Sequence, residues 1–321
     1  MAEAAAGAWM YGDPEAWDLR AAIAAHHGVA AANVMVGEGI DALLGNLVRL
    51  MVAEGDPVAT SAGAYPTFNY HVIGFGGVIA AAPYRDDAED PEALLALAQA
   101  TGARLVYLAN PDNPMGSWRA AAEVVALVDG LPEGAVLCLD EAYADFAPPA
   151  AIPPLDVAEP RVIRMRTFSK AYGMAGARIG YALGEAGLIA AVDRVRNHFG
   201  VNRIAQAGAR AALGDRAWLA HVVGEVAAAR ARIAAIAAAS GLRALPSATN
   251  FVAVDCGRDG DFARAVLRGL IARGVFVRMP FIAPQDRCIR VTAGRAADLD
   301  AFAEALPQAL EAARAEAGTA G

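Results

Sequence analysis

Lysine is almost absent from this 321-residue chain. Of its 27 basic residues, every one except Lys170 is an arginine. Such a composition suggests a coding bias that replaces lysine by arginine wherever only a positive charge is needed. An amine differs from a guanidinium because it can lose its proton near neutral pH and attack a carbonyl. The sole lysine is therefore a candidate reactive group, although an isolated lysine is more often a solvated surface charge.

Cysteine is scarce as well. Cys138, Cys256 and Cys288 are odd in number and widely spaced, which excludes a disulfide framework and a CxxC metal site. Cys138 lies in an apolar run, where a small buried side chain is the simplest interpretation. We therefore expect no metal ion and a reducing, cytoplasmic location.

Long apolar runs and an excess of positive charge are also missing. Charges or glycines interrupt the apolar stretches within about 18 residues, too few to span a bilayer, and the first residues lack the features of a signal peptide. The net charge of −8 and the isoelectric point near 5.2 argue against a nucleic-acid-binding surface. The hydrophobic content of 56% excludes a disordered chain.

Short β-rich runs alternate with alanine-rich helical runs through the first part of the chain. We expect strands at residues 34–36, 57–61, 77–81, 104–108, 135–139 and 162–166. We expect helices at residues 14–27, 39–52 and 91–100, with Asp13 and Asp90 as the N-caps of the first and the last. Apolar strands that feed helices predict a mainly parallel sheet that is covered on both faces.

The pattern changes after Arg203. Two helices within residues 205–240, separated near Gly214, precede a strand at 250–254, a helix at 261–273, short strands at 275–278 and 288–292, and a helix from Ala296. This order predicts a compact α+β unit. We therefore divide the chain into an N-terminal segment with a shortened arm (1–27), a large domain (28–225) and a small C-terminal domain (226–321).

Polar clusters follow three of the expected strands. They are residues 110–116 (NPDNPMG), 140–143 (DEAY) and 167–170 (TFSK). Ligands of parallel α/β sheets gather at the carboxyl ends of the strands. We therefore expect these three clusters to form one site.

Together with Arg290-Val291-Thr292 and Gly294, these clusters resemble the motifs of fold-type I pyridoxal-phosphate aminotransferases. The lysine loop, continued by residues 171–181 (AYGMAGARIGY), is similar to that of the histidinol-phosphate aminotransferase branch. The order and rough spacing match from about Tyr11 to the end. The resemblance implies pyridoxal 5′-phosphate as cofactor. It also implies the fold-type I α/β architecture, in which a large cofactor-binding domain with a mainly parallel seven-stranded sheet precedes a small C-terminal α+β domain.

The resemblance also assigns a role to each matching side chain. Lys170 would bond to the cofactor and move a proton, Asp140 would hold the proton of the ring nitrogen, and Tyr143 would bond the 3-oxygen of the ring. The other cofactor contacts would come from Tyr11, Gly39, Ile40, Asp41, Phe68, Asn113, Thr167, Ser169 and Arg178. Arg278 and Arg290 would bind the carboxylate or phosphate of the substrate.

The chemistry of these residue types is consistent with such roles. A buried or cation-flanked lysine has a lowered pKa and becomes nucleophilic. Gly39 at a helix start offers backbone N–H groups and the positive helix end to a phosphate. Arg178 can bind the same phosphate bidentately, whereas Ile40 can contribute only its backbone.

Simpler interpretations stay open for several of these residues. Asp140 could cap a turn, and Asn113 could serve only the geometry of its own turn. Phe68 could be an ordinary core aromatic, and Arg278 could form a surface salt bridge. Asn202 lies in a family-like segment, but the sequence assigns no role to it.

The predicted activity is transfer of an amino group from an amino acid or a histidinol-phosphate-like donor to a 2-oxo acid such as 2-oxoglutarate. The resemblance implies a homodimer in which Tyr11 reaches the neighbouring active site, with no nucleic-acid or membrane partner. One alternative is a threonine-phosphate decarboxylase, which shares these motifs. Another is a truncated, weakly active paralogue, because only ten residues precede Tyr11 where the family carries a longer arm. A ligand-sensing regulator would need a DNA-binding module there.

Overall fold

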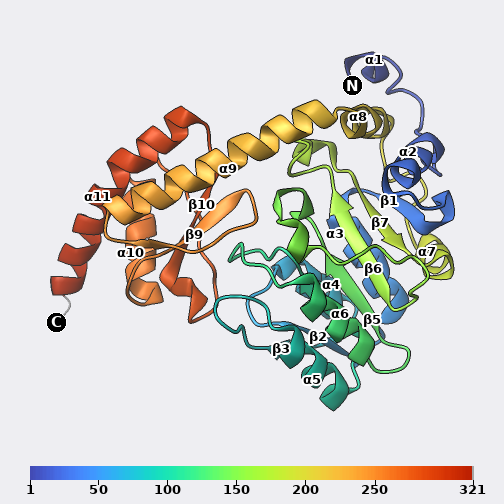
Figure 1. Cartoon of the computed structure of the whole chain (residues 1–321), viewed down its shortest axis with the longest axis horizontal. Coiled ribbons are helices and arrows are strands. Elements are labelled where there is room, and N and C mark those ends of the chain that lie inside the picture. Colours follow the sequence, from blue (N-terminus) through green and yellow to red (C-terminus); the bar gives the residue numbers. More distant parts are fainter. Residues whose placement is uncertain (320–321) are drawn as a thin grey trace.

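Two β-sheets organise residues 1–319, the part of the chain that the computed structural model describes (Figure 1). In spatial order, the seven strands of the larger sheet are β1 (Val34–Gly37), β7 (Gly180–Gly184), β6 (Val162–Thr167), β5 (Val136–Asp140), β4 (Leu105–Ala109), β2 (Pro57–Ser61) and β3 (Val78–Ala82). The smaller sheet of the described residues contains β10 (Cys288–Thr292), β9 (Phe251–Asp255) and β8 (Arg243–Ala244). The expected α/β fold class, with a mainly parallel seven-stranded sheet, is confirmed.

Strand β7 is the exception to the parallel arrangement. It runs antiparallel to both of its neighbours, β1 and β6, whereas β6, β5, β4, β2 and β3 are mutually parallel. The connection from β6 to β7 contains no crossover helix, so these neighbouring strands pair antiparallel. Residue Thr167 pairs with Gly180, and the loop between them carries Lys170. The lysine loop therefore starts and ends at the same edge of the sheet.

Helices cover both faces of the large sheet. They are α2 (Trp17–His27), α3 (Gly39–Met51), α4 (Pro66–Gly74), α5 (Pro91–Thr101), α6 (Ala121–Gly130), α7 (Ala186–Asp193) and α8 (Arg203–Gly214). Alternation along β4 shows the two layers, because Tyr107 packs in the core with α3 and α4, whereas Leu108 packs with α5 and α6. At the β1–β7 end, α2 and α8 complete the second layer.

The C-terminal part is built around the smaller sheet. Its helices are α9 (Arg216–Ala239), α10 (Gly260–Ile271) and α11 (Ala296–Thr319), which share an apolar core with β9 and β10. Figure 1 shows α9 running from beside the large sheet to the small one. The division at residue 225 stays a prediction, and α9 passes it without a break. A short helix, α1 (Ala2–Ala5), lies near the amino terminus.

Two of the expected elements differ from the structure. Helix α2 starts at Trp17 because Ala16 adopts a left-handed conformation (φ 44°), although the Asp13 carboxylate does accept the N–H of Trp17 at 2.7 Å. The predicted strand at 275–278 was wrong, because only Arg278 pairs with β10, through Arg290. The N–H of Val275 instead bonds the carbonyl of Leu270 in the last turn of α10 at 3.0 Å, and Pro280 has no N–H to continue the ladder beyond Arg278.

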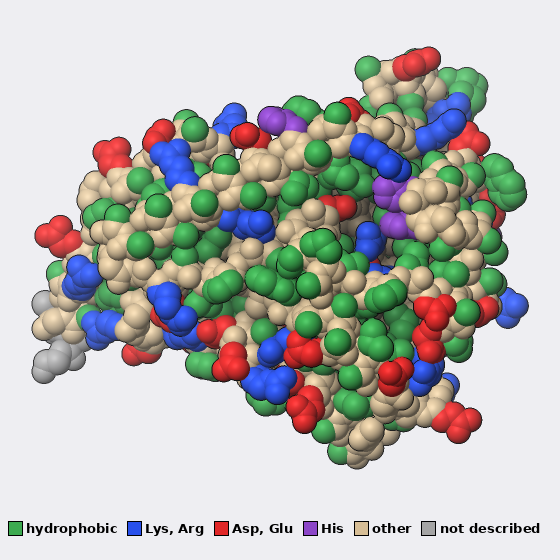
Figure 2. Space-filling view, viewed as in Figure 1, with side chains coloured by type: hydrophobic (Ala, Val, Ile, Leu, Met, Phe, Trp, Pro, Cys, Tyr) green, Lys and Arg blue, Asp and Glu red, His purple; other side chains and the backbone are tan. Residues whose placement is uncertain are grey.

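The remaining surface features concern membranes and charge. Within residues 1–319, no helix is long and apolar enough to cross a membrane. On the face shown in Figure 2, acidic and basic side chains are interspersed and do not form one basic stripe. The described part of the chain holds no cluster of side chains suited to a metal ion, and its three cysteines are buried and free.

Candidate active site

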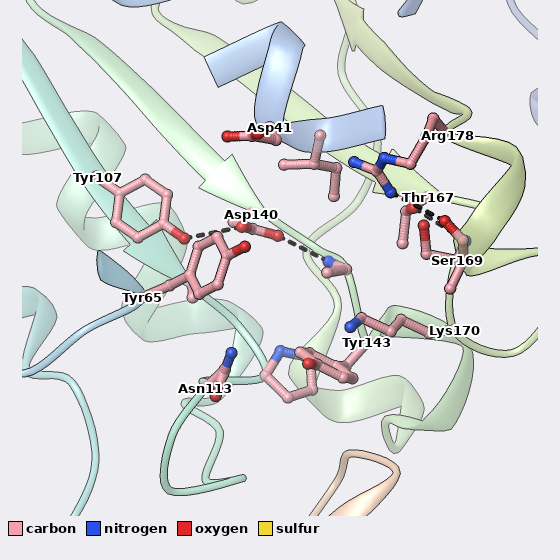
Figure 3. A pocket seen from close by; sticks show the side chains of 15 residues that line it. Asp41, Tyr65, Tyr107, Asn113, Asp140, Tyr143, Thr167, Ser169, Lys170 and Arg178 are labelled. Carbon is pink, nitrogen blue, oxygen red and sulfur yellow. Dashed lines mark hydrogen bonds between the residues drawn. The ribbon is translucent and has the colours of Figure 1, made fainter. Parts of the chain in front are cut away.

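A pocket lies where the carboxyl ends of β4, β5 and β6 meet the amino end of α3 (Figure 3). The structure brings nine of the predicted site residues into its lining: Ile40, Asp41, Asn113, Asp140, Tyr143, Thr167, Ser169, Lys170 and Arg178. These residues come from five separate segments of the chain. The expectation that the polar strand ends would converge is therefore met by the geometry.

Lys170 extends from the lysine loop into this pocket (Figure 3). Its Nζ lies 5.2 Å from the ring centroid of Tyr143. Burial lowers the pKa of Lys170 most, Arg290 and Arg178 lower it further, and the charge of Asp140 opposes them. The amine is thus easier to deprotonate than a surface lysine, which suits a nucleophile or a base.

Asp140 ends β5 and faces the pocket from its floor. The hydroxyl of Tyr107 donates to its Oδ2 at 2.8 Å, and the N–H of Ala142 donates to its Oδ1 at 2.9 Å. Burial raises the pKa of this carboxyl, while the two hydrogen bonds and Lys170 counteract the shift. The second bond shows that Asp140 does shape its own turn. A carboxylate held this way can also accept a hydrogen bond from a protonated ring nitrogen.

The opposite end of the pocket is suited to an anion. Helix α3 begins there at Gly39, so its first N–H groups are free of partners within the helix. The side chains of Thr167, Ser169 and Arg178 line the same end. The Arg178 guanidinium bonds only carbonyl oxygens, those of Ala175 and Glu38, and it pairs with no carboxylate in residues 1–319.

Glycine is required at this end of the pocket. Gly39 has φ +82°, and a Cβ there would come within 2.5 Å of Nη2 of Arg178. At Gly180, a Cβ would meet the carbonyl oxygen of Arg166 at 2.8 Å. The close approach of backbone and guanidinium leaves a narrow cradle of positive charge and N–H donors. That combination fits a phosphate group.

Arg290 on β10 and Arg278, which forms an isolated bridge to it, lie beside the pocket but do not belong to its lining. Nη1 of Arg290 donates a hydrogen bond to Oδ1 of Asn113, and the guanidinium of Arg290 lies 4.8 Å from the centroid of the Phe251 ring. The buried Nε of Arg290 has no partner in the described residues. Arg278 is joined to Arg290 by backbone hydrogen bonds and lies 6.0 Å from the Phe276 ring. The surface salt bridge considered for Arg278 is not observed within residues 1–319.

The contact with Arg290 also orients Asn113. Because a guanidinium only donates hydrogen bonds, the amide oxygen of Asn113 must face Arg290. Its amide nitrogen is then directed toward the pocket, as Figure 3 shows. Asn113 can therefore donate to a ligand oxygen.

The structure does not bring Phe68 to the pocket. Its side chain is fully buried and stacks on Tyr107 with a centroid separation of 4.5 Å, so the core-aromatic interpretation describes it. Tyr65, at the amino end of α4, lines the pocket instead. The sequence carried one signal for this residue, because Pro66 at the first helical position places Tyr65 at the turn that follows β2.

Two further residues lie outside the pocket of their own chain. Tyr11 is 80% exposed, and its ring centroid lies 4.8 Å from that of Phe199. Asn202 accepts the N–H of Ala205 at 2.8 Å and so caps α8, and it also donates to the carbonyl of Ala177. Asn202 therefore connects α8 to the turn before Arg178, which accounts for the residue that the sequence left unassigned.

Comparison with known proteins identifies the family. The family model for class I and II aminotransferases matches residues 2–306. The chain belongs to this family. The histidinol-phosphate aminotransferase of Anaeromyxobacter sp. (strain Fw109-5) is 40% identical over 280 residues, which are 85% of this chain and 77% of that protein. Histidinol-phosphate aminotransferase 1 of Mesorhizobium japonicum is 34% identical over 94% of this chain and 83% of its own length.

A solved structure supports the same assignment. The crystal structure of histidinol-phosphate aminotransferase from Sinorhizobium meliloti in complex with pyridoxal-5′-phosphate has a TM-score of 0.95 and 54% identity, over 96% of this chain and 85% of that one. This aminotransferase is therefore a pyridoxal-phosphate-dependent enzyme of the histidinol-phosphate aminotransferase-like branch. Its pocket fits the cofactor, since the anion cradle and the carboxylate of Asp140 lie at opposite ends with the Lys170 amine between them.

Proposed function

We propose that the enzyme transfers the amino group of histidinol phosphate, or of a chemically similar donor, to a 2-oxo acid such as 2-oxoglutarate. The observation that carries this proposal is the pair Arg278 and Arg290, joined through their backbones beside the pocket. Within residues 1–319 neither guanidinium has a carboxylate partner, so both are available to a dianionic group. The names of the relatives support this donor and do not favour the decarboxylase or the weakly active paralogue.

We assign the cofactor contacts from the same geometry. Thr167, Ser169, Arg178 and the first N–H groups of α3, from Gly39 to Asp41, would hold the phosphate. Asp140 would hold the ring nitrogen, Asn113 and Tyr143 would donate to the 3-oxygen, and Tyr65 would cover the ring in the place expected for Phe68. Exposed Tyr11 would contact the phosphate in the second subunit of a homodimer.

Each catalytic side chain then has a defined task. When bound, pyridoxal phosphate supplies an aldehyde that reacts with amines and a ring that withdraws electrons. Lys170, whose pKa is lowered by burial, would take the proton from the α-carbon of the donor and return it on the cofactor side. Asp140 would keep a proton on the ring nitrogen, and Arg290 would orient the substrate anion.

Substitution of Arg178 tests the anion cradle. Arg178→Gln removes the only guanidinium in the pocket lining, and a hydrogen bond to a charged group contributes about 1.5–3 kcal/mol. We expect the Kd for pyridoxal phosphate, measured by absorbance titration of the apoenzyme, to rise about 10–100-fold. Arg210→Gln, on exposed α8, serves as the control. An unchanged Kd in Arg178→Gln would remove Arg178 from the phosphate site.

A donor panel tests the proposed substrate. With 2-oxoglutarate as acceptor, we expect kcat/KM to be highest for histidinol phosphate and about 100-fold lower for histidinol, which lacks the phosphate. In Arg278→Ala we expect histidinol phosphate to lose about 10-fold or more while histidinol changes little. Equal rates with both donors would contradict recognition of a dianion. CO2 release from threonine phosphate without amino transfer would overturn the proposed reaction.

A further inference from the structure

Two carboxyl groups are buried in contact with each other behind the pocket. Glu89 is 2% exposed and Asp112 is 1% exposed, and their side chains lie within hydrogen-bonding reach of each other. Within residues 1–319, neither forms an ion pair with an arginine, lysine or histidine. Asp112 immediately precedes Asn113, and neither carboxyl has a place in the cofactor or substrate contacts assigned above.

Glu89 connects two strands of the large sheet. Its Oε2 accepts the hydroxyl of Ser61 at 2.7 Å, and its Oε1 accepts the N–H of Ala109 at 3.2 Å. Ser61 ends β2 and Ala109 ends β4. The Arg119 guanidinium holds the segment from outside, since its Nε donates to the carbonyl of Glu89 at 2.7 Å.

Asp112 organises the loop that carries Asn113. Its Oδ2 accepts the N–H of Met115 at 3.1 Å, and its Oδ1 accepts the hydroxyl of Tyr84 at 2.9 Å. These bonds fix the turn on both sides of Asn113, whose amide oxygen accepts from Arg290. A change at Asp112 would thus alter the position of Asn113 first and, through the hydrogen bond between them, that of Arg290.

Two carboxyls in contact inside a protein cannot both be ionised, because their charges repel and neither is solvated. Each carboxyl accepts one backbone N–H and one hydroxyl, and Asp112 has in addition the positive charge of Arg290 nearby, which favours its ionised form. The other titratable or charged groups that face the two carboxyls are Tyr84, Tyr107, Tyr143 and Arg119. Burial raises the pKa of both acids, and the charge of Asp112 raises that of Glu89 further.

We propose that Glu89 and Asp112 share one proton, carried by Glu89, and that this pair positions Asn113 and, through it, Arg290. The effect on substrate rests on the function proposed for Arg290, whereas the shared proton does not. Both residues are positioning residues, because they act on the pocket through Asn113. The pair contributes one negative charge behind the pocket, next to the guanidinium of Arg290.

The proton itself can be observed in the holoenzyme by infrared spectroscopy. At pH 8 we expect the carbonyl stretch of a protonated carboxylic acid in the wild type and its loss in Glu89→Gln. Glu92→Gln, a matched change at an exposed glutamate three residues away, should retain the band. The absence of the band from the wild type would overturn the proposal, and so would its persistence in Glu89→Gln. Neither measurement requires a turnover or a known donor.

Thermal unfolding provides a second test with a definite sign. A carboxyl whose pKa is raised by folding makes stability fall as pH rises from about 4.5, its unfolded value, toward the folded value. The Tm of Glu89→Gln relative to the wild type should therefore increase between pH 5 and pH 8, because the amide cannot ionise. A constant Tm difference across this range would contradict a buried proton on Glu89.

Kinetics then tests the positioning role. Glu89→Gln keeps a hydrogen-bond donor toward Asp112, so we expect its KM values to stay within about twofold of the wild type. Glu89→Ala loses this hydrogen bond, and we expect KM for the amino-group substrate to rise about 10-fold with kcat changed less than about threefold. Equal losses in both variants, or a loss in kcat alone, would reject the positioning role. Failure of every donor would instead reject the proposed function and leave the spectroscopic result standing.

Discussion

Replacement of Lys170 by arginine should lower kcat for transamination by about 10,000-fold or more, while the fold and the net charge are kept. A guanidinium cannot lose its proton at any pH the enzyme tolerates, so it can neither bond to an aldehyde nor take a proton from carbon. Burial and the nearby arginines lower the pKa of Lys170. An arginine in the same place would stay protonated, because its pKa in water is much higher. Steady-state rates and the absorbance of bound cofactor provide the measurement.

Two further variants make this test specific to Lys170. Lys170→Ala, supplied with a small amine such as methylamine, should recover part of the lost rate because the amine can occupy the space left by the side chain. Arg210→Lys adds an exposed lysine on α8 and should change nothing. Turnover that survives in Lys170→Arg would show that the reaction does not pass through this amine.

Asp140→Asn should lower kcat by about 1,000-fold, the second-largest effect expected in the chain. Asparagine keeps the size of the side chain and can still accept the N–H of Ala142, as Asp140 does at 2.9 Å. It cannot carry the negative charge that holds a proton on the ring nitrogen. The measurement is kcat in single-turnover and steady-state assays with the cofactor at saturation.

The same variant separates two interpretations of Asp140. If Asp140 only shaped its turn, asparagine would replace it with little loss, because asparagine serves such turns equally well. Tyr107→Phe is the graded comparison, since it removes one hydrogen bond to Asp140 and keeps the aromatic stack on Phe68. We expect it to cost about 10-fold. A rate in Asp140→Asn above that of Tyr107→Phe would contradict the catalytic role.

Much of the large sheet could be predicted because its signals are local. Apolar strands such as β5 end at polar residues such as Asp140, and both features are visible within a few positions of the sequence. The antiparallel direction of β7 was harder to predict from the sequence, because it depends on whether the chain crosses over the sheet after Lys170 or turns back. The strand expected at 275–278 was wrong, because Val275 bonds back to the end of α10 and Pro280 cannot extend the pairing beyond Arg278.

The site shows a similar division. The order of polar clusters was enough to bring Lys170, Asp140 and Arg178 into one pocket. Phe68 and Tyr65 could not be distinguished in this way, because three residues at the start of a helix decide which ring faces the cavity and which enters the core. Only the folded chain shows such a choice.

Individual side-chain contacts between distant segments could not be predicted. Asn113 and Arg290 are 177 positions apart, and the pair of Glu89 and Asp112 forms only because the segment before α5 meets the loop after β4 at the carboxyl ends of the strands. A buried acid also contradicts the usual preference of carboxylates for solvent. Composition and periodicity therefore gave no reason to place Glu89 in the interior.

The presence of a single lysine, placed inside the pocket, has a practical consequence for the chemistry of the whole surface. Reagents that modify amines find only two kinds of target on this chain, its amino terminus and Lys170. The exposed arginines do not undergo acylation or reductive alkylation under conditions that modify amines, because a guanidinium stays protonated. Any side-chain label of this type is thus a direct count of active sites, and protection from it is a direct count of those that are filled.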